Sequence, residues 1–294
     1  MSQKTLSALK PQELLEAVLA SNEKTKDPRL KEVLASAIRH LHEFALEVDL
    51  KPDELQVGLD FLVAVGKATG PEKHEGILLA DILGVSTLVQ VRDARHALAA
   101  GGTEPALVGP FWRANQPIRP NGAHIASEST PGPGLTVNVQ VTDLSGRPIP
   151  GARVETWQAS PKGLYENQDP EQEDMNLRAR FESDADGRIW FTSVRPAGYP
   201  VPTDGPCGDL LVAQGRHVMR PAHLHFIVVA PGFKVLATQF FDADDPHAYD
   251  DVVFGVVGSL LRKFEPDPNG GYWIDLQLKL EPGETHIPHC PLPN

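Results

Sequence analysis

The chain has 294 residues and a net charge of −12, with no concentrated run of Lys and Arg, which argues against nucleic acid as a partner because phosphate binding needs clustered positive charge. Its length suffices for one large domain or two ordinary ones. No stretch reaches the ~20 apolar residues of a membrane span, and the opening segment MSQKTLSALKPQELLEAVL lacks an apolar run followed by a cleavage site, so we expect neither a membrane span nor export.

Between residues 11 and 95 the apolar positions recur at helical spacing, which predicts three or four amphipathic helices. In one of them Asp27 suits the N-cap and Pro28 the first helical position, followed by one apolar stripe made of Leu30, Val33, Leu34, Ile38, Leu41 and Ala45. A similar start precedes the next helix, which should stop at Gly70 and Pro71. The region is small for an independent core, so we expect some of this apolar surface to face a second subunit.

A connector rich in Pro and Gly follows, and from Leu135 onward the apolar period changes to two. Phe111 and Trp112 are too apolar for a free linker, so we expect the connector to be ordered. The strand candidates are LTVNVQVTD, GARVETWQA, LRARFESD, GRIWFTSV, AHLHFIVVA, KVLATQFF and YWIDLQLKL. We predict an α+β fold, with a helical domain at residues 1–105 and an antiparallel β-sandwich at residues 106–294.

Two histidines lie two residues apart in the strand candidate AHLHFIVVA. Residues i and i+2 of a strand point to the same face, so His223 and His225 project into one space. Neutral imidazole is a common metal ligand, and two on one strand form a preset pair of nitrogen donors. A pair of core histidines held by hydrogen bonds remains the alternative for this motif taken alone.

Two of the four tyrosines, Tyr165 and Tyr199, fall in loops upstream of these histidines. A loop tyrosine is usually a packed ring with a hydrated hydroxyl group. A phenol whose pKa is near ~10 suits zinc poorly at neutral pH, but a hard trivalent ion can hold it as phenolate. Two phenolates and two imidazoles together would suit ferric iron.

At this point the chain resembles a known family. The segments LVGPFWR, GLYENQD, GYPVPTDGP, GRHVMRPAHLHF and APGFKVLATQFF are similar, in order and along nearly the whole chain, to the motifs of the intradiol ring-cleavage dioxygenases. The resemblance implies one Fe(III) per subunit held by Tyr165 and His223 in the equatorial plane and by Tyr199 and His225 as axial ligands. It also implies that the helical domain joins a homodimer, with a lipid as a further ligand between helical domains.

The resemblance further implies the reaction. A catechol-type substrate would bind through both ring oxygens, with Tyr199 leaving the metal and accepting a substrate proton, before dioxygen attacks the ring. Arg220 would stabilise negative charge on the ring or on an intermediate, and Gln239 would line the same pocket. From the residues alone, a structural ion pair with a nearby acid explains Arg220 equally well.

The residues that the resemblance places around the substrate are Leu78, Asp81, Leu107, Val108, Gly109, Pro110, Phe111, Val201, Pro202, Arg220 and Val253. A carboxylate facing a pocket is costly unless it meets a polar partner, and a third substrate hydroxyl would be one for Asp81. A helix-end role is the alternative for Asp81. The segment YPVPTDGPCGDLL is also similar to the hydroxyquinol and chlorocatechol branches, so we expect hydroxyquinol (benzene-1,2,4-triol) to be cleaved to 3-hydroxymuconate, the enol form of maleylacetate, with catechol or a chlorocatechol as the alternative substrate.

Two departures from the family pattern bear on substrate range rather than on reaction type. Trp112 follows Phe111 where catechol enzymes tend to carry tyrosine, and Cys207 stands where valine is usual in the hydroxyquinol branch. Cys207 and Cys290 form neither a disulfide framework nor a CxxC motif, so we expect free thiols in a reducing cytoplasm.

Two hypotheses from other classes remain at this point. The segment VQVTDLSGRPIPGARVETWQA, followed by SDADGRIWFTSVRPAGY, is also similar to transthyretin-like sandwiches, which often act only as binding modules. A zinc hydrolase would use His223 and His225 with a third ligand from among His217, His247 and His286, but it leaves both tyrosines unexplained.

Overall fold

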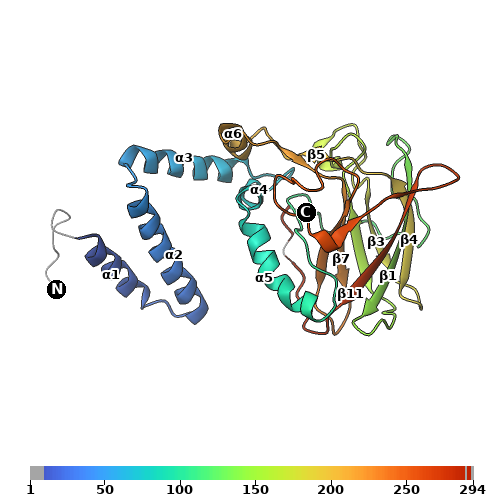
Figure 1. Cartoon of the computed structure of the whole chain (residues 1–294), viewed down its shortest axis with the longest axis horizontal. Coiled ribbons are helices and arrows are strands. Elements are labelled where there is room, and N and C mark those ends of the chain that lie inside the picture. The colour runs from blue at the N-terminus through green and yellow to red at the C-terminus, as the bar shows by residue number, and fades with distance from the viewer. Residues whose placement is uncertain (1–9, 289, 293–294) are drawn as a thin grey trace. The chain divides into compact units, whose positions relative to one another are not determined.

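A computed structural model describes residues 10–288 and 290–292 of the chain, shown whole in Figure 1. The chain forms two compact units, Met1–Leu62 and Val63–Asn294, and the boundary between them falls within α3 (Pro52–Ala68). The first nine residues, on which the expectation of no export partly depends, lie outside the described part.

The first unit contains α1 (Pro11–Asn22), α2 (Pro28–Glu47) and the start of α3. The predicted start of α2 is confirmed, since the Asp27 carboxylate accepts hydrogen bonds from the backbone N–H groups of Arg29 (2.8 Å) and Leu30 (3.0 Å). The stripe on α2 is not buried in the single chain, where Leu41 is 64% exposed. An amphipathic helix whose apolar stripe is exposed has apolar surface available for a partner.

The second unit begins with the end of α3 and continues through α4 (Glu75–Ile82) and α5 (Val85–Ala99). Together with α1 and α2 this makes five helices in the described part up to Ala99, one more than the upper prediction. Within the unit, α4 and α5 lie on the side away from β1 and β4 (Figure 1). No helix in residues 10–288 and 290–292 is long and apolar enough to cross a membrane.

Two principal sheets form the rest of the second unit. The first has the order β10 (Glu265–Pro266), β11 (Tyr272–Leu280), β1 (Gly134–Asp143), β4 (Arg188–Val194). The second has the order β3 (Arg178–Glu182), β2 (Arg153–Trp157), β7 (His223–Val229), β8 (Leu236–Asp242), β9 (Leu261–Arg262). A small third sheet pairs β5 (Tyr199–Pro200) with β6 (Met219–Arg220), and α6 (Pro206–Ala213) lies between these two strands in the sequence. All seven predicted strands are present, and the α+β class is confirmed.

The sheets are mixed, which corrects the expectation of a purely antiparallel sandwich. β1 pairs with β4 in the antiparallel sense but with β11 in the parallel sense, in a register that places Leu135 opposite Tyr272. β8 and β9 are also parallel. Parallel neighbours require a long connection rather than a hairpin, and the segment that separates β1 from β11 provides it.

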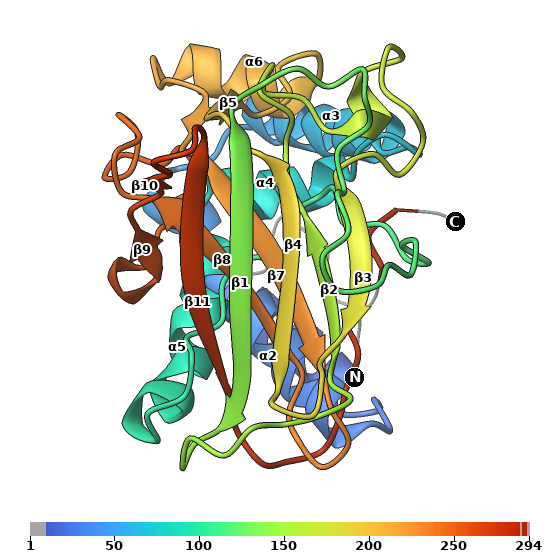
Figure 2. The same cartoon turned by 90° about the vertical axis from the view of Figure 1, so that its right-hand side faces the viewer.

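The main core lies between the two principal sheets, whose layers are seen in Figure 2. On β1 the residues alternate, with Leu135 and Val137 inside and Asn138 outside. β7 is different because six of its seven residues are buried. Leu224 and Phe226 join the main core, whereas Ile227 belongs to a second cluster on the opposite face. That opposite face is the one that carries His223 and His225.

Candidate functional site

The two histidines of β7 lie on a strand that is hydrogen-bonded on both sides. His225 is opposite Trp157 of β2 and Gln239 of β8, and His223 is opposite Phe241 of β8. Each histidine is 2% exposed. A central strand flanked in this way fixes the direction of both imidazoles.

The structure brings all four sequence-predicted metal ligands together. The Tyr165 hydroxyl lies 3.1 Å from Nε2 of His225 and donates to the Tyr199 hydroxyl at 3.4 Å. The Nε2 atoms of His223 and His225 are 3.0 Å apart. Two phenol oxygens and two imidazole nitrogens, supplied by three separate segments, therefore converge in a buried space.

Each tyrosine is held by its own local structure. Tyr165 caps the short 3₁₀ helix η2 (Glu166–Gln168), and its ring stacks on Phe111 with centroids 4.6 Å apart. Tyr199 lies on β5 opposite Arg220 of β6. Gly163 adopts a φ of +78°, and a Cβ atom there would lie 3.2 Å from the Cβ of Tyr199. This glycine therefore allows the two tyrosine loops to approach each other.

Hydrogen bonding determines the tautomer of His223, and so which ring nitrogen has a lone pair available for a metal. Nδ1 of His223 lies 2.7 Å from the carbonyl oxygen of Pro221, an acceptor, so Nδ1 carries the hydrogen and Nε2 presents its lone pair to the centre. The His225 ring stacks on Trp157 with centroids 4.4 Å apart and planes 8° from parallel. Gly109 approaches the same ring, since a Cβ there would lie 3.7 Å from Cε1.

Burial fixes the protonation states of these groups. It lowers the pKa of His223 to about 3 and holds that of His225 well below its ordinary value, so both imidazoles are neutral and suited to coordination. Burial raises the pKa of Tyr165 well above its ordinary value, and it also raises the pKa of Tyr199 although Arg220 opposes this shift. A phenolate is thus stable here only beside a strong positive charge, so the donor set fits a highly charged cation.

Arg220 lies beside this cluster and forms a buried ion pair with Asp251. The Arg220 side chain is 4% exposed and the Asp251 side chain is 1% exposed. Its Nε and Nη2 donate to the Asp251 carboxylate at 3.1 and 3.0 Å, and Nη2 also donates to the Gln239 amide oxygen at 3.2 Å. Burial acts to lower the pKa of Arg220, but the Asp251 carboxylate outweighs it and holds the pKa above its ordinary value. The predicted structural ion pair therefore exists, and the guanidinium stays charged next to both tyrosines.

Asp81 is buried on α4, three residues after Leu78 on the same helical face. Burial raises its pKa to about 6, although a hydrogen bond with Ser86 and the charge of Arg220 oppose the shift. A carboxyl group that titrates near pH 6, with a guanidinium in range, is typical of a functional position.

The other predicted pocket residues lie on segments that border the cluster. Phe111 stacks on Tyr165, and the Leu107 carbonyl accepts a hydrogen bond from the Gln239 amide. Val201 and Pro202 directly follow β5, and the Val253 N–H donates to the Asp251 carboxylate at 3.3 Å. Most of the set is buried, with Val108, Gly109 and Pro202 partly exposed, and the buried members are Leu78, Asp81, Leu107, Pro110, Phe111, Val201, Arg220 and Val253.

Sequence reasoning missed Asp251, Trp157 and a buried network around Glu166. Arg178 donates to Glu166 at 2.7 Å and to the Phe111 carbonyl at 2.7 Å, and Arg113 donates to Glu166 at 2.7 Å. This network joins the residue after Tyr165 to the residue that stacks on it. Sequence reasoning allowed a nearby acid as a partner for Arg220, but nothing in the segment DPHAYDDVV singles out one of its three aspartates.

The third ligands expected for a zinc hydrolase lie elsewhere. His217 and His247 face Asp250 on the surface, and His286 faces Glu284 in an exposed pair.

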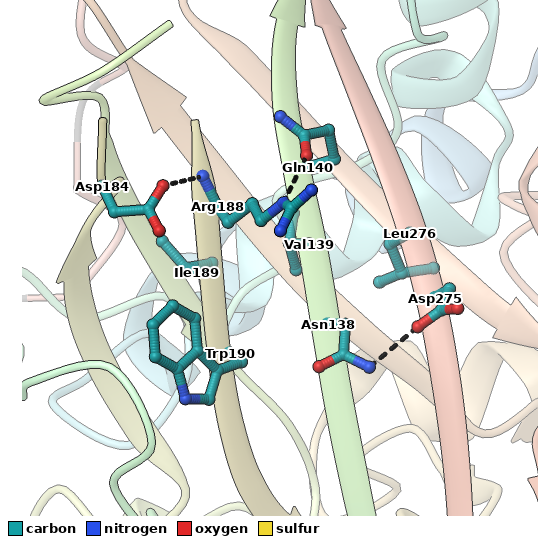
Figure 3. Close-up of a pocket in the computed structure, with 9 residues that line it drawn as sticks. All are labelled: Asn138, Val139, Gln140, Asp184, Arg188, Ile189, Trp190, Asp275 and Leu276. Atoms are coloured by element: carbon teal, nitrogen blue, oxygen red, sulfur yellow. Dashed lines mark hydrogen bonds between the residues drawn. The ribbon is translucent and has the colours of Figure 1, made fainter. Parts of the chain in front are cut away.

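A hollow of about 580 Å³ opens on the outer face of β1, β4 and β11, lined by Trp190, Arg188, Asp275 and their neighbours (Figure 3). It contains none of the predicted site residues, and it faces solvent, so we do not associate it with the cluster.

Comparison with known proteins gives a consistent picture. A family described as "Dioxygenase" matches residues 107–274, and one described as "Catechol dioxygenase N terminus" matches residues 27–101. A hydroxyquinol 1,2-dioxygenase of Rhizobium sp. strain MTP-10005 is 43% identical over 85% of this chain and 84% of its own. A 6-chlorohydroxyquinol 1,2-dioxygenase of Cupriavidus pinatubonensis is 39% identical over 92% and 96%. The crystal structure of hydroxyquinol 1,2-dioxygenase from Pseudomonas putida DLL-E4 superposes with a TM-score of 0.81 at 38% identity, over 92% of this chain and 99% of that one.

Proposed function

Because the chain belongs to the intradiol ring-cleavage dioxygenase family, we propose that it cleaves hydroxyquinol between its two adjacent hydroxylated carbons, with dioxygen as the oxidant. Both oxygen atoms enter the product, 3-hydroxy-cis,cis-muconate, the enol form of maleylacetate, so no added reductant is needed. Catechol or a chlorocatechol is the alternative substrate. A non-enzymatic transthyretin-like module no longer describes the chain, since both halves match a family of enzymes.

We propose that Tyr165, Tyr199, His223 and His225 hold one Fe(III) per subunit. The observation that carries this proposal is a chain of close contacts between the four side chains: Tyr199 to Tyr165 at 3.4 Å, Tyr165 to His225 at 3.1 Å, and His225 to His223 at 3.0 Å between their Nε2 atoms. Bound ferric iron would supply the Lewis acidity that holds a catecholate and directs it toward dioxygen.

The remaining roles belong to the protein. Tyr199, once ionised, accepts a substrate proton at its hydroxyl oxygen. Arg220 is held by Asp251 and Gln239 with its charge directed at the cluster, where it stabilises negative charge that develops on the ring. Gln239 fixes the guanidinium through its oxygen and the Leu107 segment through its nitrogen. The buried packing around Phe111 and Trp157 excludes water.

Asp81 is the residue that favours a triol over a diol. As a carboxylate it accepts a hydrogen bond from the third hydroxyl group, which adds to the Ser86 hydrogen bond and further offsets the cost of burying the charge. This role depends on the hydroxyquinol proposal and distinguishes it from cleavage of catechol.

Visible absorption and oxygen uptake test these proposals. Phenolate bound to ferric iron absorbs visible light strongly, so the purified protein should be red to burgundy, and Tyr165→Phe should weaken the band. A colourless, iron-free preparation with full ring-cleaving activity would rule out the iron site. Faster oxygen uptake with catechol or chlorocatechols than with hydroxyquinol would overturn the assignment of hydroxyquinol as the substrate but would leave the proposed reaction class unchanged.

We further propose a homodimer that forms through the helical domain at residues 1–105, with a lipid held between the helical domains. The exposed apolar stripe of α2 supports the dimer. A cytoplasmic location is also our proposal, supported by the free thiols of Cys207 and Cys290.

A further inference from the structure

A second group of side chains of the types that bind metal ions lies near the surface, outside the four-residue cluster. One ligand atom from each of His217, His247 and Asp250 lies within 4.8 Å of the others. The two imidazole rings stack with centroids 5.3 Å apart and planes inclined by 22°. Nothing in the proposed ring cleavage uses these three residues.

The distances suit a small divalent ion. Nδ1 of His247 lies 2.9 Å from one oxygen of Asp250, and Nε2 of His217 lies 3.8 Å from the other. The edge of a tetrahedron with metal–ligand bonds of ~2.1 Å is about 3.4 Å long, between these two values. Two imidazoles and one carboxylate are also common zinc ligands.

We propose that His217, His247 and Asp250 form a second metal site, which takes an exchangeable divalent transition-metal ion such as Zn²⁺. Three protein ligands leave one tetrahedral position for water. A hollow of about 540 Å³ beside the group, lined by His217 and Asp250 among others, gives solvent and the ion access to that position.

The loop that carries two of the ligands is fixed by the backbone around it. The Asp245 carboxylate accepts hydrogen bonds from the N–H groups of His247 (2.8 Å) and Ala222 (2.9 Å), and the Asp250 N–H donates to the His247 carbonyl at 3.3 Å. Nδ1 of His217 accepts from the Met219 N–H at 3.2 Å, so coordination through Nε2 exchanges this one hydrogen bond for a metal bond. Preorganisation of this kind favours binding because little loop entropy is lost.

The site joins two segments that also meet in the interior. Asp250 precedes Asp251, the partner of Arg220, and His217 lies three residues before Arg220. The Val252 N–H donates to the Met219 carbonyl at 3.1 Å, which links the same two segments. A bound ion therefore clamps the surface ends of the segments that support the buried ion pair, and we expect it to raise the unfolding temperature.

Calorimetric titration of the iron-loaded full-length protein with Zn²⁺ tests the proposal. We expect one Zn²⁺ per chain, with unchanged iron content. His247→Gln and His217→Gln should each weaken binding by at least about tenfold, because even changes that only reorient a ligand cost 10- to 100-fold. The matched control is His286→Gln, which alters an exposed histidine paired with a single acid, Glu284, and should bind Zn²⁺ as the native chain does.

Zinc uptake that is equal in all three variants, or that occurs only as iron is lost, would overturn the site. Anomalous scattering at the zinc edge from a soaked crystal gives a readout independent of affinity. A peak between the three side chains supports the proposal, and a peak only at other positions rejects it.

Discussion

At the residue scale, the pair of Arg220 and Asp251 combines stability with the proposed chemistry. We predict that Asp251→Asn lowers the free energy of unfolding by about 3–5 kcal/mol, since it leaves a buried guanidinium without its counter-charge. Urea unfolding measures this change, and oxygen uptake should show a turnover that falls roughly 100-fold as Arg220 loses its orientation. The control is Asp275→Asn on the outer face of β11, where Asp275 accepts from Asn138 and the change should stay within about 0.5 kcal/mol (Figure 3). Equal free energies of unfolding for the two variants would contradict the role of Asp251 as the counter-charge of the buried Arg220.

Asp81 provides a prediction about pH, because burial raises its pKa to about 6 in the folded chain. Between the unfolded value near ~4 and the folded value, the folded state holds a proton that the unfolded state has lost. Ionisation of Asp81 therefore lowers the free energy of unfolding as pH rises through this window, by about 3 kcal/mol in all. Above the window this contribution no longer changes with pH.

The ionisation of Asp81 should also change the preference of the enzyme between substrates. We predict that the ratio of kcat/KM for hydroxyquinol to that for catechol rises with pH, with a midpoint near the Asp81 pKa of about 6, since only the carboxylate accepts the third hydroxyl. Asp81→Asn should abolish this inflection and lower the ratio, while catechol turnover changes little. An inflection that persists in Asp81→Asn would assign the titration to another group.

The limits of sequence inference are visible at this scale. The spacing of His223 and His225 predicted their shared face, and motif order pointed to Tyr165 and Tyr199. Asp251 is the partner of Arg220 because a loop returns to β6 after 31 residues, and local periodicity does not encode that return. The Trp157 ring against His225 depended in the same way on strand order in the sheet.

At the element scale, Arg178 joins β3 to the segments that carry Tyr165 and Phe111. We predict that Arg178→Gln costs about 3–5 kcal/mol in urea unfolding, because it removes the buried partner of Glu166. Iron retained after dialysis against a chelator should also fall, since the Tyr165 segment loses its anchor. Arg188→Gln is the matched control, as Arg188 is exposed on β4 and donates only to polar neighbours such as Gln140 (Figure 3). Iron retention that matches this control would show that the network does not support the site.

Elements with a long periodic pattern were predictable, and short ones were not. All seven strands with alternating or continuous apolar runs were identified, as were the cap and start of α2. The two-residue strands β5, β6, β9 and β10 carry no period, and α6 has only eight residues. The parallel pairing of β1 with β11 was missed because strand direction leaves no trace in an alternating pattern.

At the scale of the whole molecule, the apolar stripe on α2 gives a prediction about assembly. We expect the native chain to sediment as a dimer and the double variant Leu41→Glu/Phe44→Glu to shift toward the monomer, because both side chains are more than half exposed on one face of α2. Glu43→Gln, an exposed change two positions from Leu41 and off that face, should leave the dimer intact. Sedimentation that is identical in all three proteins would place the dimer contact elsewhere.

The parallel pairing of β1 with β11 has a consequence for biosynthesis. β1 lies between β4 and β11, so the main core is completed only when β11, the last strand in the part of the chain that the structure describes, is in place. A ribosome must therefore have released the chain through Leu280 before this sheet can close, and the inner face of β7, opposite the face that carries the two histidines, packs against a finished layer only then. Loading of the metal should thus follow translation rather than accompany it, and nascent chains that stall before Tyr272 should be exposed to chaperones and proteases.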